Sequence, residues 1–524
     1  MSPLTAANQP CNLKKICVLS TLLFITCISY SQSFFKLIAS KQLNANYCRD
    51  IMQTNDGGYL LAGGSTLQTD DTYANAKGFL VKLNTSGDTV WTRRFESNCQ
   101  AWNGLIPTSD GNFLAVGAYD LNKLNQFIFP KASIAKFNNA GSVLWQKNME
   151  GTFSAFAFSC GLLTKDGSNI IVGASSATLS TDAGVYILNL ASTGNIAWNK
   201  VLTAGGKQLL PSSVKELIEG GFIITGIATT SDNQNDIFVM KTDASGNLAW
   251  CKFFGKDTDS DTGAGVIETS DSGFLLAGST STSGSGSSDF TLIKLDKDGN
   301  IVWNKTYGKQ GTETAYSFIP YENDNYVIMG LTNSFNSVFY DTYLLIVDGN
   351  GNVQQSKRVP SGAGPELTLT RPQMIKNTNG DYVLGGNFIN PNNSSIDLGI
   401  IKFESDFVSC SNTVDATYDE GEGPVSYTLD FASTSRGSFS NMNVPITSGG
   451  SVTTICSNIP VTNVKSGNWS DPATWSNHQV PSATDKVELN FDVVVDINAD
   501  CFSLKTNNHQ VHVNANILMN IHGK

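Results

Sequence analysis

Oxygen-bearing side chains have the spacing of a calcium-binding loop in the stretch DTDSDTGAGVIE, residues 257–268. Carboxylates, the hard ligands that calcium prefers, occupy positions 1, 3, 5 and 12 of that loop as Asp257, Asp259, Asp261 and Glu268. Position 6 is Thr262, where the loop needs a glycine for its turn, and we expect no helices on either side. The same stretch also suits a plain connection between two strands. Calcium binding and a plain connection are therefore both open.

Histidine and cysteine chemistry is not supported by the sequence. The four histidines are all near the C-terminus, at His478, His509, His512 and His522, so a histidine-based active site is excluded from the rest of the chain. No Cys-x-x-Cys pair occurs, so a zinc knuckle or a thioredoxin-type site has no support in the sequence. Asp and Glu are plentiful, and two carboxylates would suffice for a glycosidase, but the sequence singles out no pair.

The charge balance is acidic. The chain has 34 Lys and Arg against 45 Asp and Glu, a formal net charge of -11, and it has no basic run. Because nucleic-acid binding needs a clustered positive surface, we expect no nucleic-acid partner. The 48 glycines and the low charged fraction of 15% suit many turns rather than long helices, which favours an all-β fold.

The first 31 residues have the features of an export signal. Lys14 and Lys15 precede the apolar run ICVLSTLLFITCIS, and small residues suit cleavage before Gln32. This run is short for a membrane span, so an N-terminal anchor is the alternative, and we expect no transmembrane span after cleavage. Export permits disulfides, and we expect one between Cys410 and Cys456.

A hairpin pattern recurs seven times, at intervals of 52 to 56 residues. Each copy places a turn before a run of alternating or continuous apolar residues. The copies are TNDGGYLLAGG (54–64), TSDGNFLAVGA (108–118), TKDGSNIIVGA (164–174), LIEGGFIITGI (217–227), TSDSGFLLAGS (269–279), YENDNYVIMGL (321–331) and NTNGDYVLGGN (377–387). A repeat of this length is typical of a propeller or a repeat array.

Each repeat continues with a second pair of predicted strands around a Gly-Asn turn, as in DFTLIKLDKDGNIVWNKTYG at 289–308. Four strands per repeat form one propeller blade, and seven repeats predict a seven-bladed β-propeller over residues 32–408. The seventh repeat lacks its fourth strand, while SFFKLIAS at 33–40 resembles such a strand. We therefore expect the N-terminal strand to close the last blade, which leaves no open edge.

Tryptophan recurs in the predicted fourth strand of five repeats, at Trp91, Trp145, Trp198, Trp250 and Trp303, with Gln355 in the sixth place. Large rings repeated in register are expected to pack between neighbouring blades. With this pattern, about residues 33–408 resemble quinoprotein-like and delta-60-type propellers, especially the Asp-Gly-Gly/Trp repeats of type IX secreted bacterial surface proteins. The resemblance implies the fold and export. Quinone binding is not implied, because the chain has no adjacent cysteine pair.

Two segments follow the predicted ring. Residues 409–460 are rich in Ser, Thr and Gly and suit a linker or a small β module. Residues 461–524 contain, from Ser466 onward, the stretch SGNWSDPATWSNHQVPSATDKVEL, which resembles the start of β-solenoid-like modules in type IX secreted proteins. In QVHVNANILMNI, apolar residues alternate from Val511 to Ile521, which predicts a half-buried strand. No sorting domain is visible, and the segment looks incomplete.

Large aromatic residues gather in the predicted connections that vary most between repeats. In an up-and-down blade alternate connections lie on the same face, so these variable connections share one face. Aromatics there are costly unless they pack locally or bind, and they are candidate ligand contacts: Trp102, Tyr119, Phe127, Phe129, Phe335, Phe339 and Tyr340. We predict an exported, non-enzymatic binding scaffold of the bacterial cell surface or extracellular space, with a glycan or protein ligand. A carbohydrate-active hydrolase or lyase on the same face is the alternative.

Overall fold

The computed structural model describes residues 33–521 of the chain with short gaps. The gaps are 40–42, 68–76, 96–98, 120–130, 151–154, 177–182, 205, 231–233, 256–259, 282–283, 336–339, 360–371, 390–395, 405–406, 408–413, 416–418, 422–425, 428–430, 435–437, 442–445, 448–450, 458–460, 477–479, 482–485, 502, 506, 508–509 and 515–516. The expected export signal therefore lies outside the described residues. No helix in the described part is long and apolar enough to cross a membrane.

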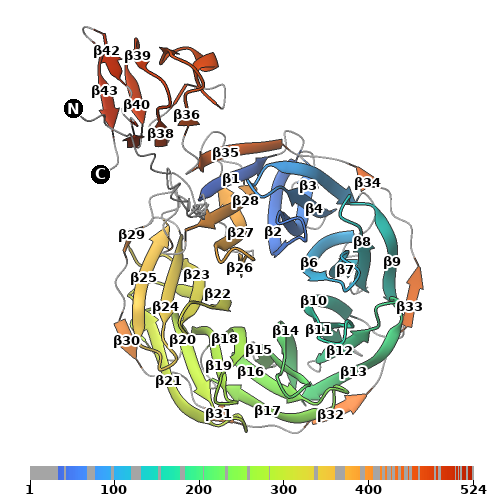
Figure 1. Cartoon of the computed structure of the whole chain (residues 1–524). Coiled ribbons are helices and arrows are strands. Elements are labelled where there is room, and N and C mark those ends of the chain that lie inside the picture. The colour runs from blue at the N-terminus through green and yellow to red at the C-terminus, as the bar shows by residue number, and fades with distance from the viewer. Residues whose placement is uncertain are drawn as a thin grey trace, which may run out of the picture. The chain divides into compact units, whose positions relative to one another are not determined.

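Seven four-stranded antiparallel blades form a ring, which confirms the predicted seven-bladed β-propeller (Figure 1). Blade one is β2 (Leu43–Gln53), β3 (Tyr59–Leu67), β4 (Lys77–Leu83) and β5 (Thr89–Phe95). Blade two is β6 (Cys99–Pro107), β7 (Phe113–Tyr119), β8 (Lys131–Phe137) and β9 (Val143–Glu150). Blade three is β10 (Ala155–Leu163), β11 (Asn169–Ser176), β12 (Gly184–Leu190) and β13 (Ile196–Ala204). Blade four is β14 (Lys207–Glu216), β15 (Phe222–Thr230), β16 (Asn235–Thr242) and β17 (Leu248–Phe254).

The remaining blades follow in the same order around the ring. Blade five is β18 (Thr262–Glu268), β19 (Phe274–Thr280), β20 (Asp289–Leu295) and β21 (Ile301–Gly308). Blade six is β22 (Glu313–Pro320), β23 (Tyr326–Thr332), β24 (Asp341–Val347) and β25 (Val353–Val359). Blade seven is β26 (Gln373–Lys376), β27 (Tyr382–Ile389), β28 (Ile396–Phe403) and, from the N-terminus, β1 (Phe34–Ala39).

The N-terminal strand closes the ring, as the sequence predicted. Strand β1 pairs antiparallel with β28, with Leu37 opposite Gly399. Its apolar side chains Phe34, Leu37 and Ile38 are almost completely buried. Both chain ends of the propeller repeat thus meet in blade seven, and the blade acquires the same four-stranded form as the other six.

An outer belt surrounds the ring, formed by the short strands of residues 414–457 (Figure 1). Each belt strand pairs antiparallel with the outermost strand of one blade, in the order blade six, five, four, three, two, one and seven. The strands are β29 (Val414–Asp415), β30 (Asp419–Gly421), β31 (Ser426–Tyr427), β32 (Phe431–Thr434), β33 (Ser438–Asn441), β34 (Ile446–Thr447) and β35 (Ser451–Ser457). The sequence suggested a linker or a small β module here; instead, each belt strand adds a fifth strand to one blade.

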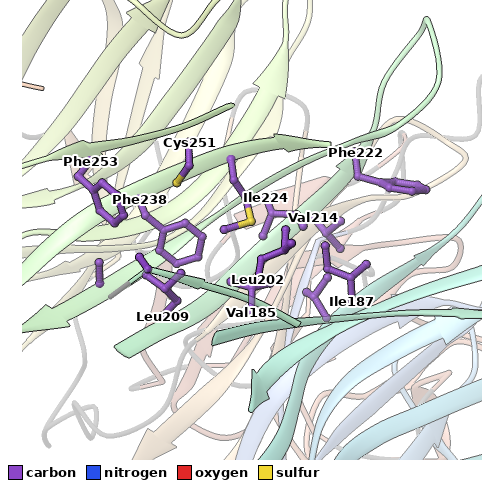
Figure 2. Close-up of a cluster of buried hydrophobic side chains, with 14 of the residues drawn as sticks. Val185, Ile187, Leu202, Leu209, Val214, Phe222, Ile224, Phe238, Cys251 and Phe253 are labelled. Atoms are coloured by element: carbon purple, nitrogen blue, oxygen red, sulfur yellow. The ribbon is translucent and has the colours of Figure 1, made fainter. Parts of the chain in front are cut away.

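The hydrophobic core lies between neighbouring blades. Figure 2 shows one such cluster, in which Val185, Ile187 and Leu202 of blade three face side chains of blade four that include Leu209 and Phe238. The five predicted tryptophans also pack between neighbouring blades, close to the turns. A β-carbon added to the turn glycine of the next blade would stand 2.6–2.9 Å from the tryptophan ring, at Gly141, Gly194, Gly246, Gly299 and Gly351. The predicted packing of tryptophan between blades is confirmed.

The C-terminal residues form three sets of short parallel strands, which is the pairing of a β-solenoid. Its elements are β36 (Val461–Thr462), β37 (Gly467–Asn468), the 3-10 helix η3 (Pro472–Thr474), β38 (Lys486–Glu488), β39 (Val493–Val495), β40 (Ala499–Cys501), β41 (Ser503–Lys505), β42 (Val511–Val513) and β43 (Met519–Ile521). Trp469 and Trp475 are buried and pack edge to face. The strand expected over 511–521 is divided between β42 and β43, because the chain leaves one sheet and joins another.

Candidate functional site

The two faces of the ring differ in their connections. On one face, here the tight-turn face, every connection within a blade has five residues, as at 269–273 between β18 and β19 and at 296–300 between β20 and β21. On the other, here the variable-loop face, the connections between second and third strands range from four residues (231–234) to eleven (120–130). Those between blades range from two residues (205–206) to thirteen (360–372). Sequence divergence is therefore concentrated on one face.

The acidic turn residues of the tight-turn face hold the turns together. The Thr54 hydroxyl donates to Asp56 Oδ1 at 2.6 Å, and Lys82 Nζ, on a buried side chain, donates to the same oxygen at 2.8 Å. Partial burial opposes ionisation, but these hydrogen bonds lower the pKa of Asp56 to about 2. The equivalent Asp271 bonds to Lys294 at 2.7 Å and has the same pKa. Both carboxylates are therefore engaged in hydrogen bonds within their own blades.

Buried aspartates are the first or second residue of the third strand in blades four to seven, at the variable-loop end. Asp236, Asp289, Asp341 and Asp397 are each at most 4% exposed. In blade four, Lys207 Nζ lies 2.6 Å from Asp236 Oδ2, and in blade six, Arg358 Nη1 lies 2.7 Å from Asp341 Oδ2. Both of these buried carboxylates therefore have a cationic partner. Sequence analysis missed this set, although an Asp near the start of DIFVMK, DFTLIK, DTYLLI and DLGIIK was its visible signal.

Asp289 of blade five instead faces Glu313, the first residue of blade six. A β-carbon on Gly308 would stand 1.5 Å from Asp289 Oδ1 and 2.5 Å from Glu313 Oε2, so the two oxygens are close neighbours. Glu313 accepts hydrogen bonds from the Thr332 and Ser334 hydroxyls at 2.5 Å and from the Lys309 backbone N–H at 2.9 Å. Burial, and then the charge of Glu313, raise the pKa of Asp289 to about 6.

An unusual aspartate also lies in the innermost strand of blade one. Asp50 Oδ2 accepts a hydrogen bond of 2.7 Å from the backbone N–H of Leu105 in blade two, and its Oδ1 accepts one from Ile51. Burial raises the pKa of Asp50 to about 7, against these hydrogen bonds. This carboxylate joins two inner strands. A polar bond of the same kind links blades four and five, where Ser212 Oγ donates to the carbonyl of Gly263.

Two of the predicted aromatic ligand contacts pack, wholly or partly, against other side chains of the propeller. Trp102 is completely buried and packs edge to face against Phe95 and Phe137, so its ring offers no surface to a ligand and leaves the candidate set. Phe335 is half-buried and packs against Tyr343, with the Arg358 guanidinium 5.3 Å from its ring centre.

Tyr340 is half-buried immediately before β24, in a connection of the variable-loop face. Tyr119 ends β7, and its side chain lies outside the described set. Phe127, Phe129 and Phe339 lie outside the described residues altogether. Of the seven aromatics, Tyr340 and Phe335 are thus the two whose described side chains lie in a variable connection.

The stretch with calcium-loop spacing does not wrap around one point. Asp257 and Asp259 lie outside the described residues, but Asp261 immediately precedes β18 and Glu268 is its last residue. Seven extended residues of about 3.3 Å each separate these two carboxylates by roughly 20 Å, too far for one ion. Glu268 instead accepts a hydrogen bond of 2.7 Å from the Ile218 backbone N–H. Asp261 and Glu268 therefore do not act as ligands of one calcium loop.

The cysteines that the structure describes are not arranged as reactive thiols. Cys48 and Cys251 are buried free thiols, and Cys160 is half-buried. Burial raises the pKa of both Cys48 and Cys251 far above that of an ordinary thiol, which disfavours the reactive thiolate. Cys410 lies outside the described residues, while Cys456 lies in β35 opposite Phe35 of β1. Their disulfide stays a prediction.

Comparisons with known proteins leave the function open. No family model matches the chain, and no curated protein matches it. Among solved structures, the chain is similar to a gluconolactonase from Xanthomonas campestris, with 11% identity and a TM-score of 0.31 over 56% of this chain and 86% of that one. At this level of similarity no activity and no residue role is carried over. What the chain itself establishes is a seven-bladed β-propeller with an outer belt and divergent connections on one face.

Proposed function

We propose that this chain is an exported, non-enzymatic binding scaffold of the bacterial cell surface or extracellular space, which holds a glycan or protein ligand on its variable-loop face. One observation carries the proposal, the contrast between uniform five-residue turns on one face and connections of two to thirteen residues on the other. Loops on a rigid scaffold are where binding residues concentrate. Uniform turns are needed for the fold of each blade. Folding alone does not require connections that differ in length from blade to blade.

The polar groups support the same assignment of faces. The acidic turn residues Asp56 and Asp271 are paired with a lysine of their own blade and are occupied by the turn. The half-buried Tyr340, by contrast, lies in a variable connection and has a ring that a sugar face or an apolar side chain could cover.

No observation favours the hydrolase or lyase alternative. A glycosidase needs two carboxyl groups at least about 5 Å apart, with substrate between them. Asp289 and Glu313 are closer than that, since both oxygens lie within 2.5 Å of one point, and both side chains are buried.

The experiment compares binding with turnover on the mature full-length chain. A glycan array and titration calorimetry measure stoichiometric binding, and reducing-end release from the same polysaccharides measures hydrolysis. We expect saturable binding without product. Replacing residues 120–130 with the four-residue connection of blade four should abolish binding if those residues hold the ligand, and Tyr340→Ala should weaken binding if blade six contributes an anchor.

The matched control is Asp298→Ala, in an exposed turn of the opposite face. It should bind as the parent protein does. Loss of affinity in this control, with the variable-loop variants unaffected, would place the ligand on the tight-turn face. Catalytic release of sugar would show that the protein is an enzyme and contradict the proposal.

A further inference from the structure

Two acidic pairs occupy equivalent positions between successive blades. In each, an aspartate near the start of a third strand faces an acidic residue at the start of the next blade. A glycine that ends the intervening fourth strand, or follows it, lies beside the pair. Between blades four and five, a β-carbon on Gly255 would stand 1.9 Å from Asp236 Oδ1 and 3.0 Å from Asp261 Oδ2. Between blades five and six, the corresponding residues are Asp289 and Glu313. In both cases the glycine leaves space that carboxylates fill.

The two pairs differ in how their charge is neutralised. Between blades four and five, the ammonium group of Lys207 lies 2.6 Å from Asp236, and both side chains are buried. Between blades five and six, no lysine or arginine side chain among the described residues contacts either carboxylate. Asp289 is 1% exposed, and its Oδ1 is buried without a hydrogen-bond partner. Two adjacent ionised carboxylates in such a place repel each other strongly and require a positive species.

We propose that Asp289 and Glu313 bind a calcium ion between blades five and six, which does for this pair what the ammonium group of Lys207 does for Asp236. Two carboxylates balance the charge of a divalent ion. The hydroxyls of Thr332 and Ser334 lie against Glu313, so the surroundings offer hard oxygen donors. Calcium prefers such donors, whereas softer metals prefer nitrogen or sulfur ligands. The unpartnered Asp289 Oδ1 is the atom that the ion would satisfy.

The test measures the melting temperature of the mature full-length protein after chelation, at pH 7.5, with calcium, magnesium or sodium added. Calcium at millimolar concentration should raise the melting temperature at pH 7.5 by a few degrees, because it binds only the folded state. The rise should be smaller with magnesium. Glu313→Gln should remove the response, and Asp289→Asn provides a second variant should the first not fold.

Asp236→Asn is the matched control, since it alters the equivalent pair that already has its own lysine, and it should keep the calcium response. Absence of any calcium response at pH 7.5 would overturn the proposal, as would an unchanged response in Glu313→Gln and Asp289→Asn. A response lost in Asp257→Asn instead would assign calcium to the preceding connection.

Discussion

At the residue scale, one glycine of the repeat is fixed by a bulge in the innermost strand. Strands β2, β6, β10, β14, β18 and β22 each contain an extra residue opposite the second strand of the blade. A β-carbon on the glycine that faces this bulge would stand 1.7–2.2 Å from a backbone carbonyl oxygen, at Gly63, Gly117, Gly173, Gly226, Gly278 and Gly330. Backbone cannot move aside as a flexible side chain can, so the glycine is required.

Gly278→Ala should therefore destabilise the protein by about 2 kcal/mol or more, because the added methyl group overlaps the carbonyl of Thr262. Gly349→Ala is the control, since a β-carbon there meets no atom within 4 Å, and it should change the free energy of unfolding by less than about 0.5 kcal/mol. Urea unfolding measures both. Equal effects of the two substitutions would contradict the steric explanation.

The turn aspartates predict how stability depends on acid. The folded-state pKa of Asp56 and of Asp271 is about 2, below the ordinary value of about 3.9 expected when unfolded. Their contribution is therefore present above about pH 4 and is lost as the pH falls toward 2. Water screens part of it, because both carboxylates are more than half exposed.

Urea unfolding at pH 5, 4, 3 and 2.5 should show a free energy that falls with pH, and Asp271→Asn should make this fall shallower. Asp298→Asn is the control, because Asp298 pairs with an exposed lysine and not with a buried one. This variant should keep the parent's slope. If Asp271→Asn has the parent's slope as well, the turn carboxylates are not responsible for acid sensitivity.

At the element scale, the contact between fourth strand and neighbouring turn shows how the repeat adapts when its sequence changes. In five blades a tryptophan covers a turn glycine, and in blade seven Phe34 covers Gly87 in the same way. Blade six has Gln355 in place of tryptophan. The turn of blade seven has Phe407 in place of glycine, with a φ of 60° and a buried ring that packs on Tyr321 and Tyr382. At this contact the turn of blade seven, instead of the fourth strand of blade six, supplies the large side chain that fills the space between the blades.

The outer belt is expected to stabilise the blades by covering their edge strands. Unpaired edges expose backbone groups and promote association, and each belt strand pairs with one such edge. A chain ending at residue 408 should therefore melt several degrees lower than one ending at 460, and should aggregate more readily. Calorimetry and light scattering measure the two effects. The chain ending at 460 should melt close to the full-length protein, and similar behaviour of all three chains would mean that the belt is dispensable.

At the scale of the whole molecule, closure depends on β1, which is paired on both sides. It lies between β28 and β35, so the strand that completes the ring is itself held in place by the last belt strand. Phe34, Leu37 and Ile38 are buried there, and burial of each such side chain stabilises by about 2 kcal/mol. The ring is thus held by segments from both ends of its own sequence.

Deletion of residues 32–41 should lower the melting temperature of the mature protein by at least about 5 °C, since several kcal/mol of burial is lost. Deletion of residues 461–524 is the control, because no described strand of that module pairs with the ring, and it should change the melting temperature of the ring little. A chain without β1 that melts like the parent would contradict closure by the N-terminal strand.

The sequence by itself determined the blades. Turn residues and apolar alternation act over a few residues, so seven copies at a nearly constant interval predicted the number of blades, the strand that closes the ring and the role of the tryptophans. The same local signals could not reveal the outer belt. Its strands have as few as two residues, and their partners lie more than 50 residues away along the chain, on edges that exist only after the blades have formed.

Only the tertiary structure decided which polar and aromatic residues come together. Trp102 was predicted in a surface loop, but the interface of two blades buries it. Asp261 and Glu268 matched a calcium loop by spacing, but an extended strand holds them apart. Asp289 and Glu313 match no motif, yet they meet across two blades. The physical reason is that spacing along a chain fixes distance only within one element, whereas contacts between blades depend on how the whole ring closes.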